Sequence, residues 1–317
     1  MNGTTKNIVF LILSTIAGAA MMWWIYRGFD VHTLAEFFGQ RSNYVWIILA
    51  LAAGVLANVL RALRWRMLLE SADIHISRRR SVELIFISYL INSVTPRLGE
   101  LTRSRLVQRG NSAVSTRALG TVVVEKLADV GCLLVVIALA VSLRWQNTVA
   151  LVQRMSEGLT LALPSYTFYV VIGCVVCLLV GLSFPLWRHI RRFLVNLWEG
   201  ITAILRLRSP LSFCTLCVGI WVCNFLQLYL LLPCYEVLTH LSLADLIHVF
   251  AAASVGVLLP TPAGAGPWHF AIVKTLTTVY HTTKGVAQSF ALISHGLKTA
   301  LDMLLGVMGN ASYFRSV

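Results

Sequence analysis

Long apolar runs, separated by short polar segments, make up most of the chain. A helix needs about 20 mostly apolar residues to cross the ~30 Å hydrocarbon core of a bilayer. Runs of about this length predict membrane-spanning helices at 8–26, 45–69, 118–143, 166–186, 211–238 and 286–309. The first run is too long for the apolar core of a signal peptide, so we expect it to remain as an anchor. The predicted fold class is an all-α polytopic membrane protein with six full spans, in a single transmembrane domain over residues 1–317.

Two further apolar segments are shorter, and each runs into a break that contains Thr-Pro and glycine. The first, 82–94, would be roughly 20 Å long at about 1.5 Å per residue, which is too short for a crossing. The second, 244–259, meets the sequence PTPAGAGP and is followed by the apolar segment 267–279. We expect each to enter and leave the membrane on one side, as a re-entrant helical hairpin.

The segment 187–208 has a different pattern. Apolar residues recur there at a spacing of three and four, and they are accompanied by five arginines: Arg188, Arg191, Arg192, Arg206 and Arg208. This pattern predicts a basic amphipathic helix that lies on a membrane surface.

Composition supports the membrane assignment and its orientation. Hydrophobic residues make up 57% of the chain and charged residues only 12%, whereas soluble domains carry about 25% charged residues. The net charge of +13 suggests nucleic-acid binding, but no soluble basic domain or motif accompanies it. With the N-terminus in the cytoplasm, most Lys and Arg residues fall in cytoplasmic segments, as the positive-inside rule requires. We therefore expect an inner (cytoplasmic) membrane protein with both termini in the cytoplasm and no nucleic-acid partner.

The two short segments resemble each other. The first reads Glu-Leu-Ile from position 83 and reaches Thr-Pro at 95, and the second reads Asp-Leu-Ile from position 245 and reaches Thr-Pro at 261. The following helices align without gaps, with 118–129 over 291–302. The predicted topology sends the first segment in from the cytoplasm and the second from outside. We interpret the similarity as an inverted repeat, with one copy at about 45–143 and the other at about 211–309. Transporters built in this way bind their substrate near the middle of the membrane. The alternative is chance similarity between apolar helices.

A helix that begins inside the membrane leaves backbone N–H groups and the positive end of its dipole without partners. A phosphate suits such a site, and Arg97 and Arg103 would add charge-assisted hydrogen bonds. The candidate substrate-binding residues are Asn92, Thr95, Pro96, Arg97, Gly99, Glu100, Arg103, Thr261, Pro262, Gly264 and Gly266. Thr-Pro is also a helix-start signal, with Thr as N-cap, and Gly266-Pro267 is a second one. A cytoplasmic loop whose arginines only set topology is the alternative, and we prefer it for Arg105.

Five charged residues of the predicted spans form a candidate intramembrane network: Glu125, Lys126, Asp129, Lys298 and Asp302. Each unpaired charge at the bilayer centre would cost about 2.5–3.5 kcal/mol, so they must face one another or a wet cavity. A structural ion-pair network and a role in substrate or proton movement both remain open. Lys126 can reach Asp129 one turn away. Arg61, Arg64 and Arg66 are expected to snorkel to the cytoplasmic headgroups, unless Arg64 faces the first hairpin.

Four segments together resemble the transmembrane region of lysylphosphatidylglycerol synthases: RALRWRMLL, NSVTPRLGELTRSRLV, LGTVVVEKLAD and LLPTPAGAGPWHF. The resemblance covers roughly 45–310 and extends to stand-alone "flippase-like" members. It implies a helical domain that moves or binds lipids, in the best-known members an aminoacylated phosphatidylglycerol. The motif positions that carry over are Pro96, Arg97, Gly99, Glu100, Arg103, Glu125, Asp129, Pro260, Pro262, Gly264 and Gly266. Lys126 stands where the family often has Arg, and no aminoacyltransferase domain follows by Val317, so synthase activity is not implied.

The expected function is that of a lipid flippase or transporter, which moves or binds an anionic phospholipid or a polyprenyl-phosphate lipid between leaflets. The alternatives are a membrane-embedded lipid-linked glycosyltransferase and an accessory protein of envelope lipid synthesis. We expect no enzyme activity, because the sequence offers no nucleophile–base set and no Asp-x-Asp pair. We also expect no cofactor, no metal and no P-loop. The expected partners are an anionic lipid headgroup and the membrane, with envelope-biosynthesis enzymes or a second copy of the chain as further candidates.

Overall fold

The computed structural model describes residues 3–95, 98–108, 111–160, 198 and 202–315, and within these ranges every regular element is a helix. The α-helices are α1 (Gly3–Tyr26), α2 (His32–Gly39), α3 (Asn43–Ser71), α4 (Arg78–Val94), α5 (Leu98–Leu106), α6 (Ser112–Leu143), α7 (Trp145–Thr160), α10 (Pro210–Tyr229), α11 (Leu243–Gly256), α12 (Pro267–Thr278) and α13 (Lys284–Arg315). The 3₁₀ turns are η1 (Ala203–Arg206), η2 (Leu232–Cys234), η3 (Glu236–Leu238) and η4 (Pro262–Gly264). The all-helical prediction is confirmed.

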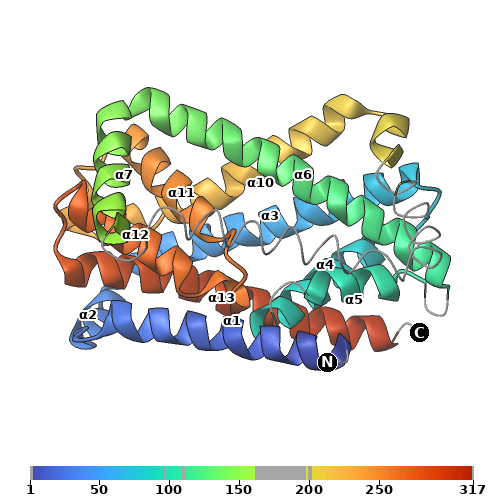
Figure 1. The fold of residues 1–317 in the computed structure, drawn as a ribbon, viewed down its shortest axis with the longest axis horizontal. Coiled ribbons are helices and arrows are strands. Elements are labelled where there is room, and N and C mark those ends of the chain that lie inside the picture. The colour runs from blue at the N-terminus through green and yellow to red at the C-terminus, as the bar shows by residue number, and fades with distance from the viewer. Residues whose placement is uncertain (1–2, 96–97, 109–110, 161–197, 199–201, 316–317) are drawn as a thin grey trace.

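Helices α1, α3, α6, α10 and α13 run along the length of the molecule and form one bundle (Figure 1). Among the described residues, three stretches are long and apolar enough to cross a membrane: Asn43–Ser71, Pro210–Cys234 and Lys284–Arg315. The count of six crossings remains a prediction. The expected span 166–186 lies outside the described residues, as does most of the expected surface helix 187–208.

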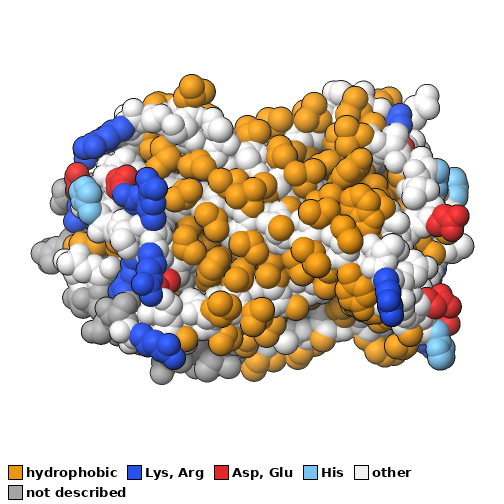
Figure 2. Space-filling model, turned by 180° about the vertical axis from the view of Figure 1, so that it is seen from behind, with side chains coloured by type: hydrophobic (Ala, Val, Ile, Leu, Met, Phe, Trp, Pro, Cys, Tyr) orange, Lys and Arg blue, Asp and Glu red, His pale blue; other side chains and the backbone are white. Residues whose placement is uncertain are grey.

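The surface is divided into zones along the same axis. Figure 2 shows a broad apolar band across the middle of one face, with Lys and Arg side chains gathered mainly at one end. This basic end is the one at which α1 begins and α13 ends (Figures 1 and 2). An apolar band between two polar ends is what a membrane-embedded bundle requires.

The first short segment is longer than the hydrophobic pattern predicted. Helix α4 begins at Arg78, because the Ser77 side chain caps it by accepting a hydrogen bond from the Arg80 N–H at 3.1 Å. Its 17 residues span about 25 Å at about 1.5 Å each, still short of a ~30 Å crossing. The predicted N-cap role of Thr95 is wrong: Thr95 ends α4, and its hydroxyl donates back to the Ile91 carbonyl at 2.8 Å.

The second short segment forms α11, η4 and α12. Helix α11 begins with a capping box, in which Ser242 and Asp245 satisfy each other's backbone N–H groups. Pro262 occupies the first position of η4, and Thr261 precedes it without making a side-chain cap. Helix α12 begins at Pro267 after Gly266, whose φ of 93° is suited to glycine. The predicted helix start at Gly266-Pro267 is confirmed.

Contacts along α13 show where the two helix pairs, α4–α5 and α11–α12, lie. At the C-terminal end of α13, Ser312 accepts a hydrogen bond from Arg79 at 2.8 Å, which places the start of α4 there. Near the middle of α13, Lys298 lies 5.1 Å from the Tyr89 ring of α4, and His295 lies 3.0 Å from the Ala263 carbonyl of η4. Helix α4 therefore begins at the basic end, whereas α11 begins at the opposite end (Figure 1), and α4 contacts η4. The inverted repeat itself remains a prediction.

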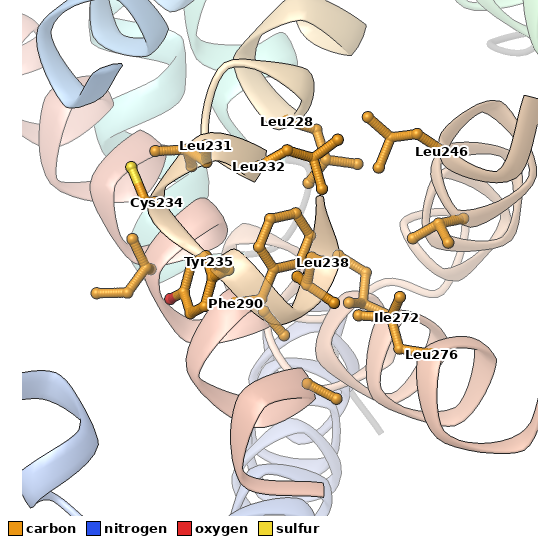
Figure 3. Packing of buried hydrophobic residues seen from close by; sticks show 14 of the residues in the cluster. Leu228, Leu231, Leu232, Cys234, Tyr235, Leu238, Leu246, Ile272, Leu276 and Phe290 are labelled. Carbon is orange, nitrogen blue, oxygen red and sulfur yellow. The ribbon is translucent and has the colours of Figure 1, made fainter. Parts of the chain in front are cut away.

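Tight packing holds this arrangement together. A Cβ on Gly306 of α13 would lie 2.4 Å from the Leu90 Cβ of α4, so only glycine permits the observed approach of the two helices. At the end opposite the termini, buried side chains of α10, η2, η3, α11, α12 and α13 form one apolar cluster. Figure 3 shows Leu238 and Phe290 among these side chains. This cluster fixes α11 and α12 against α13 and so positions the second break.

Candidate functional site

Three arginines and two carboxylates from three helices form one ion-paired group, which we call the arginine–carboxylate cluster: Arg61, Arg64, Arg103, Glu125 and Asp129. Arg103 Nη2 lies 2.7 Å from Glu125 Oε2. Asp129 lies 2.8 Å from both Arg61 Nη1 and Arg64 Nη1. The second oxygen of Glu125 is 3.5 Å from Arg61 and 3.4 Å from Arg64.

The members come together through ordinary helical spacing. Arg61 and Arg64 are three apart on α3, and Glu125 and Asp129 are four apart on α6, so each pair lies on one face of its helix. Arg103 reaches them from α5, and its guanidinium carbon lies 4.5 Å from the centre of the Trp65 ring. Trp65 is fixed in turn, because its indole N–H donates to the Thr121 hydroxyl of α6 at 3.1 Å. A flat cation on a buried indole is favourable when water is excluded.

The cluster is both buried and charged. The side chains of Arg64, Glu125 and Arg103 are 0%, 1% and 2% exposed. Three guanidinium groups against two carboxylates leave one positive charge in excess. The Nε–H groups of Arg64 and Arg103 are buried and have no hydrogen-bond partner in the part of the chain that the structure describes. Because a buried polar group without a partner is costly, these N–H groups are suited to an oxygen-rich anion.

Residues of the first break meet α6 beside this cluster, where Glu100 pairs with Lys126, the sequence neighbour of Glu125. Lys126 Nζ lies 2.9 Å from Glu100 Oε1, and the Asn92 amide donates to Glu100 Oε2 at 3.1 Å. The Gly99 N–H donates to Asn92 Oδ1 at 2.8 Å, which ties the start of α5 to α4. A Cβ on Gly99 would lie 2.0 Å from the Ser88 carbonyl oxygen, so glycine is needed for this approach. Pro96 and Arg97, two of the predicted headgroup contacts, lie outside the described residues.

The predicted intramembrane charges divide into two groups. Glu125 and Asp129 belong to the arginine–carboxylate cluster, and Lys126 pairs with Glu100 rather than with Asp129. Lys298 and Asp302 form a separate pair on α13, in which Asp302 also accepts a hydrogen bond from Asn58 of α3 at 2.7 Å. Helix α3 therefore carries partners for both groups.

Sequence reasoning missed Arg61 and Arg64 as partners in this site. Arg61 was expected to snorkel to the headgroups, and Arg64 to do so unless it faced the first hairpin. Both arginines are instead ion-paired with carboxylates of α6, and Arg64 is fully buried, so the snorkelling prediction is wrong for them. Depth along the helices is the signal that could have found them. Arg61 lies eight residues before the end of the run 45–69, and Glu125 lies eight residues after Arg117. Both are therefore roughly 12 Å inside the same membrane face.

The second break places backbone and polar side chains beside α13 and α1. Ala263, Gly264 and Gly266 have φ values of 53°, 78° and 93°, which bend the chain sharply between α11 and α12. The Thr261 hydroxyl is buried without a hydrogen-bond partner among the residues that the structure describes. A Cβ on Gly266 would lie 3.1 Å from the Gly18 carbonyl oxygen of α1, so this helix covers the break. The four predicted residues here (Thr261, Pro262, Gly264 and Gly266) thus lie together beside α1 and α13, whereas the arginine–carboxylate cluster is formed by α3, α5 and α6.

A different ion pair lies at the end of the bundle opposite the termini, outside the spanning segments. Arg144 Nε lies 2.6 Å from Asp245 Oδ1, and Ser242 donates to the other carboxylate oxygen. Partial burial acts to raise the pKa of Asp245, but hydrogen bonds from Arg144 and Ser242 outweigh it and hold the pKa below its ordinary value. The same hydrogen bond raises the pKa of Arg144. This pair fastens the end of α6 to the start of α11.

Comparison with known proteins identifies the family. The model of the lysylphosphatidylglycerol synthase transmembrane region matches residues 9–306. The chain belongs to this family. The arginine–carboxylate cluster and both breaks thus fall inside the domain that defines lysylphosphatidylglycerol synthase transmembrane regions, a family of membrane proteins of lipid synthesis and transport.

One curated relative also matches, the UPF0104 membrane protein PH1989 of Pyrococcus horikoshii. It is 23% identical over 129 residues, which cover 39% of this chain and 37% of the relative. The match supports membership of this family of membrane proteins. Because it spans little more than a third of either protein, it does not indicate an activity. No solved structure matches the chain at a significant level.

Proposed function

We propose that this protein moves an anionic lipid, either a phospholipid or a polyprenyl-phosphate lipid, between the leaflets of the inner membrane. The observation that carries the proposal is the arginine–carboxylate cluster, which buries an excess positive charge beside a helix break inside an apolar bundle. Buried charges in a membrane domain are expensive and are kept mainly where an ion or substrate passes. The family, one of lipid-related membrane proteins, agrees with this assignment.

In this proposal the lipid phosphate competes with Glu125 for Arg103 and Arg64. The phosphate oxygens accept from guanidinium N–H groups, including the Nε–H groups that lack partners among the described residues. Glu125 and Asp129 keep the arginines in place while the site is empty, so the cluster is not left with unpaired cations. When the phosphate leaves, the carboxylates take its place again. Headgroup binding is then an exchange of partners rather than the burial of a new charge.

The two helix pairs would give access from the two sides. We propose that α4–α5 and α11–α12 act as re-entrant hairpins of an inverted repeat, with the basic end in the cytoplasm and both termini there. Transporters with this plan alternate access by moving one half against the other around a midplane site. The contact of α4 with η4 at the middle of α13 would be the place where the two halves separate.

We also propose that no covalent bond is made or broken, and that the protein is not an enzyme. The cluster consists of guanidinium groups paired with carboxylates, an arrangement suited to binding an ion and without a hydroxyl, thiol or amine nucleophile beside a base. A glycosyltransferase would transfer sugar from a donor to lipid, and an accessory protein would keep its effect on envelope lipids after loss of the cluster's charges. Either result with purified or complemented protein would replace the transport proposal.

Reconstitution of the purified protein into vesicles tests the proposal. Fluorescent phosphatidylglycerol in the inner leaflet would be followed as it becomes accessible to a reducing agent outside. We expect a faster appearance than in protein-free vesicles, and a smaller effect for a labelled zwitterionic lipid. Equal rates with and without protein for several anionic headgroups would overturn the proposal.

A further inference from the structure

Two histidines outside the arginine–carboxylate cluster lie in contact at the second break. His269 of α12 and His295 of α13 have ring centroids 4.7 Å apart, with the rings inclined at 71°. Both are buried, with exposures of 1% and 8%. Neither ring belongs to the proposed headgroup site.

Each ring is hydrogen-bonded to the backbone of the break itself. His295 Nε2 lies 3.0 Å from the Ala263 carbonyl oxygen, and the Gly266 N–H points at His269 Nδ1 at 3.4 Å. A carbonyl oxygen only accepts, so His295 carries a hydrogen on Nε2. A backbone amide only donates, so His269 Nδ1 carries none and His269 is neutral. The two rings thus hold the positive-φ residues Ala263 and Gly266 from both sides of the turn.

The groups around the pair leave an added charge uncompensated. Tyr26 of α1 faces His269 edge-on at 5.6 Å, and Trp268 faces His295 at 6.0 Å. The Thr299 hydroxyl lies 3.5 Å from His295 Nδ1. The titratable residues farther along α13, Lys298 and Asp302, are paired with each other.

Beyond that pair, Asn58 of α3 and Tyr89 of α4 occupy the remaining sides of Lys298 and Asp302. Among the described residues, no carboxylate is ion-paired with either histidine. The closed break is therefore built for two neutral imidazoles.

We propose that the His269–His295 pair is a proton-binding site, and that taking up one proton opens the second break. A proton from a hydronium ion in solution adds to the lone pair of His269 Nδ1 and leaves water behind. Nδ1 then becomes an N–H donor and can no longer accept from the Gly266 N–H. The resulting imidazolium carries one positive charge in contact with a neutral ring, which excludes a second proton on the pair. Release of the same proton restores the hydrogen bond from the Gly266 N–H. Each cycle of opening and closing therefore takes up one proton and releases one proton.

The effect of pH on opening follows from the thermodynamic linkage between proton binding and opening of the second break. The closed break binds the proton poorly because it buries the charge and loses a hydrogen bond, whereas an opened, hydrated break binds it well. Lower pH therefore favours the open form, and the shift grows with the difference in proton affinity between the two forms. This inference rests on the proposed lipid movement for its biological use: a proton gradient would then bias which side of the membrane the second hairpin serves.

Hydrogen exchange tests the proton site without any lipid substrate. Exchange of the peptide that contains Ala263 to Phe270 would be compared at about pH 5.5 and about pH 7.5, a range in which histidine switches are expected to act, after correction for intrinsic rates. We expect protection in this peptide to fall at the lower pH, by up to about tenfold per pH unit. His269→Asn places an amide oxygen where Nδ1 stands and so keeps an acceptor for Gly266 without binding a proton; its protection should not change with pH. His240→Gln, at an exposed position, should behave as the unmodified protein.

Unchanged protection between the two pH values, or an equal response in His269→Asn, would overturn the inference. His295→Gln, which still donates to Ala263, provides a second folded variant and should reduce the pH response. Lipid movement measured under an imposed pH gradient separates this inference from the proposed function. A pH-dependent break without lipid movement contradicts the transport function alone, whereas lipid movement with a pH-independent break contradicts the proton site alone.

Discussion

Arg103 and Glu125 form an ion pair 2.7 Å long between α5 and α6, and both side chains are almost completely removed from solvent. Only 22 residues separate them in sequence, yet the pair joins the helix that follows the first break to a helix of the main bundle. Because two isolated charges at this depth would each be costly, the pair requires α5 to pack where it does. The pair therefore couples the position of α5, which follows the first break, to the charged groups buried inside the bundle.

Removal of Glu125 should destabilise the fold strongly. Glu125→Ala leaves Arg61, Arg64 and Arg103 with Asp129 as the remaining carboxylate of the cluster, and breaking a buried pair on one side costs about 3–5 kcal/mol. The free energy of unfolding in detergent or lipid nanodiscs measures the loss.

The double variant Glu125→Gln/Arg103→Gln removes one charge of each sign and should lose less stability than Glu125→Ala. If the double variant is the less stable of the two, the ion pair does not carry the energy assigned to it.

Gly99→Ala should prevent α5 from packing on α4. The added Cβ would lie 2.0 Å from the Ser88 carbonyl oxygen, which belongs to backbone that cannot move aside cheaply. We expect a loss of about 1–3 kcal/mol, as in other overpacked sites, together with loss of lipid movement. Gly131→Ala is the matched control, because its Cβ meets nothing within 4 Å on α6. Equal stability of the two variants in thermal unfolding would refute the close approach.

Because of the Arg144–Asp245 pair, the folded protein should lose stability at acid pH. The folded-state pKa of Asp245 lies below its ordinary value, so its contribution is complete above that ordinary value and is lost as pH falls through the lower, folded one. The midpoint of thermal unfolding should therefore fall as the pH is lowered from about 5 to about 3. Asp245→Asn should remove part of this acid dependence while the neutral-pH fold persists. An unchanged acid dependence in Asp245→Asn would mean that other carboxylates account for it.

The hydrophobic pattern predicted the helices well, because burial in a membrane leaves a signal in every residue of a span. The run 118–143 lies within α6, and 286–309 lies within α13. The start of α4 was placed four residues late because its first turn is made of arginines, and the cap at Ser77 shows only in hydrogen bonds.

Pairings within the site were harder to predict, because they depend on how helices turn toward one another. Lys126 could reach Asp129 along its own helix, but the approach of α5 gives it Glu100 instead. Arg61 was expected to reach headgroups, and only the position of α6 beside α3 shows that Asp129 holds it. The sequence showed which charged residues lie at the same depth along the predicted spans. Which of them pair with one another could be seen only in the folded structure.

The most direct test of the account is the rate of anionic lipid movement in vesicles that contain Arg103→Gln. Arg66→Gln is the control, because Arg66 also lies on the basic side of the protein but pairs with Glu70 on its own helix, outside the cluster. With both variants folded, we expect Arg103→Gln to slow phosphatidylglycerol movement by about tenfold or more, which corresponds to a rise of about 1.4 kcal/mol in the barrier to movement. Arg66→Gln should match the unmodified protein. Movement at the unmodified rate in folded Arg103→Gln would contradict a headgroup site at the arginine–carboxylate cluster.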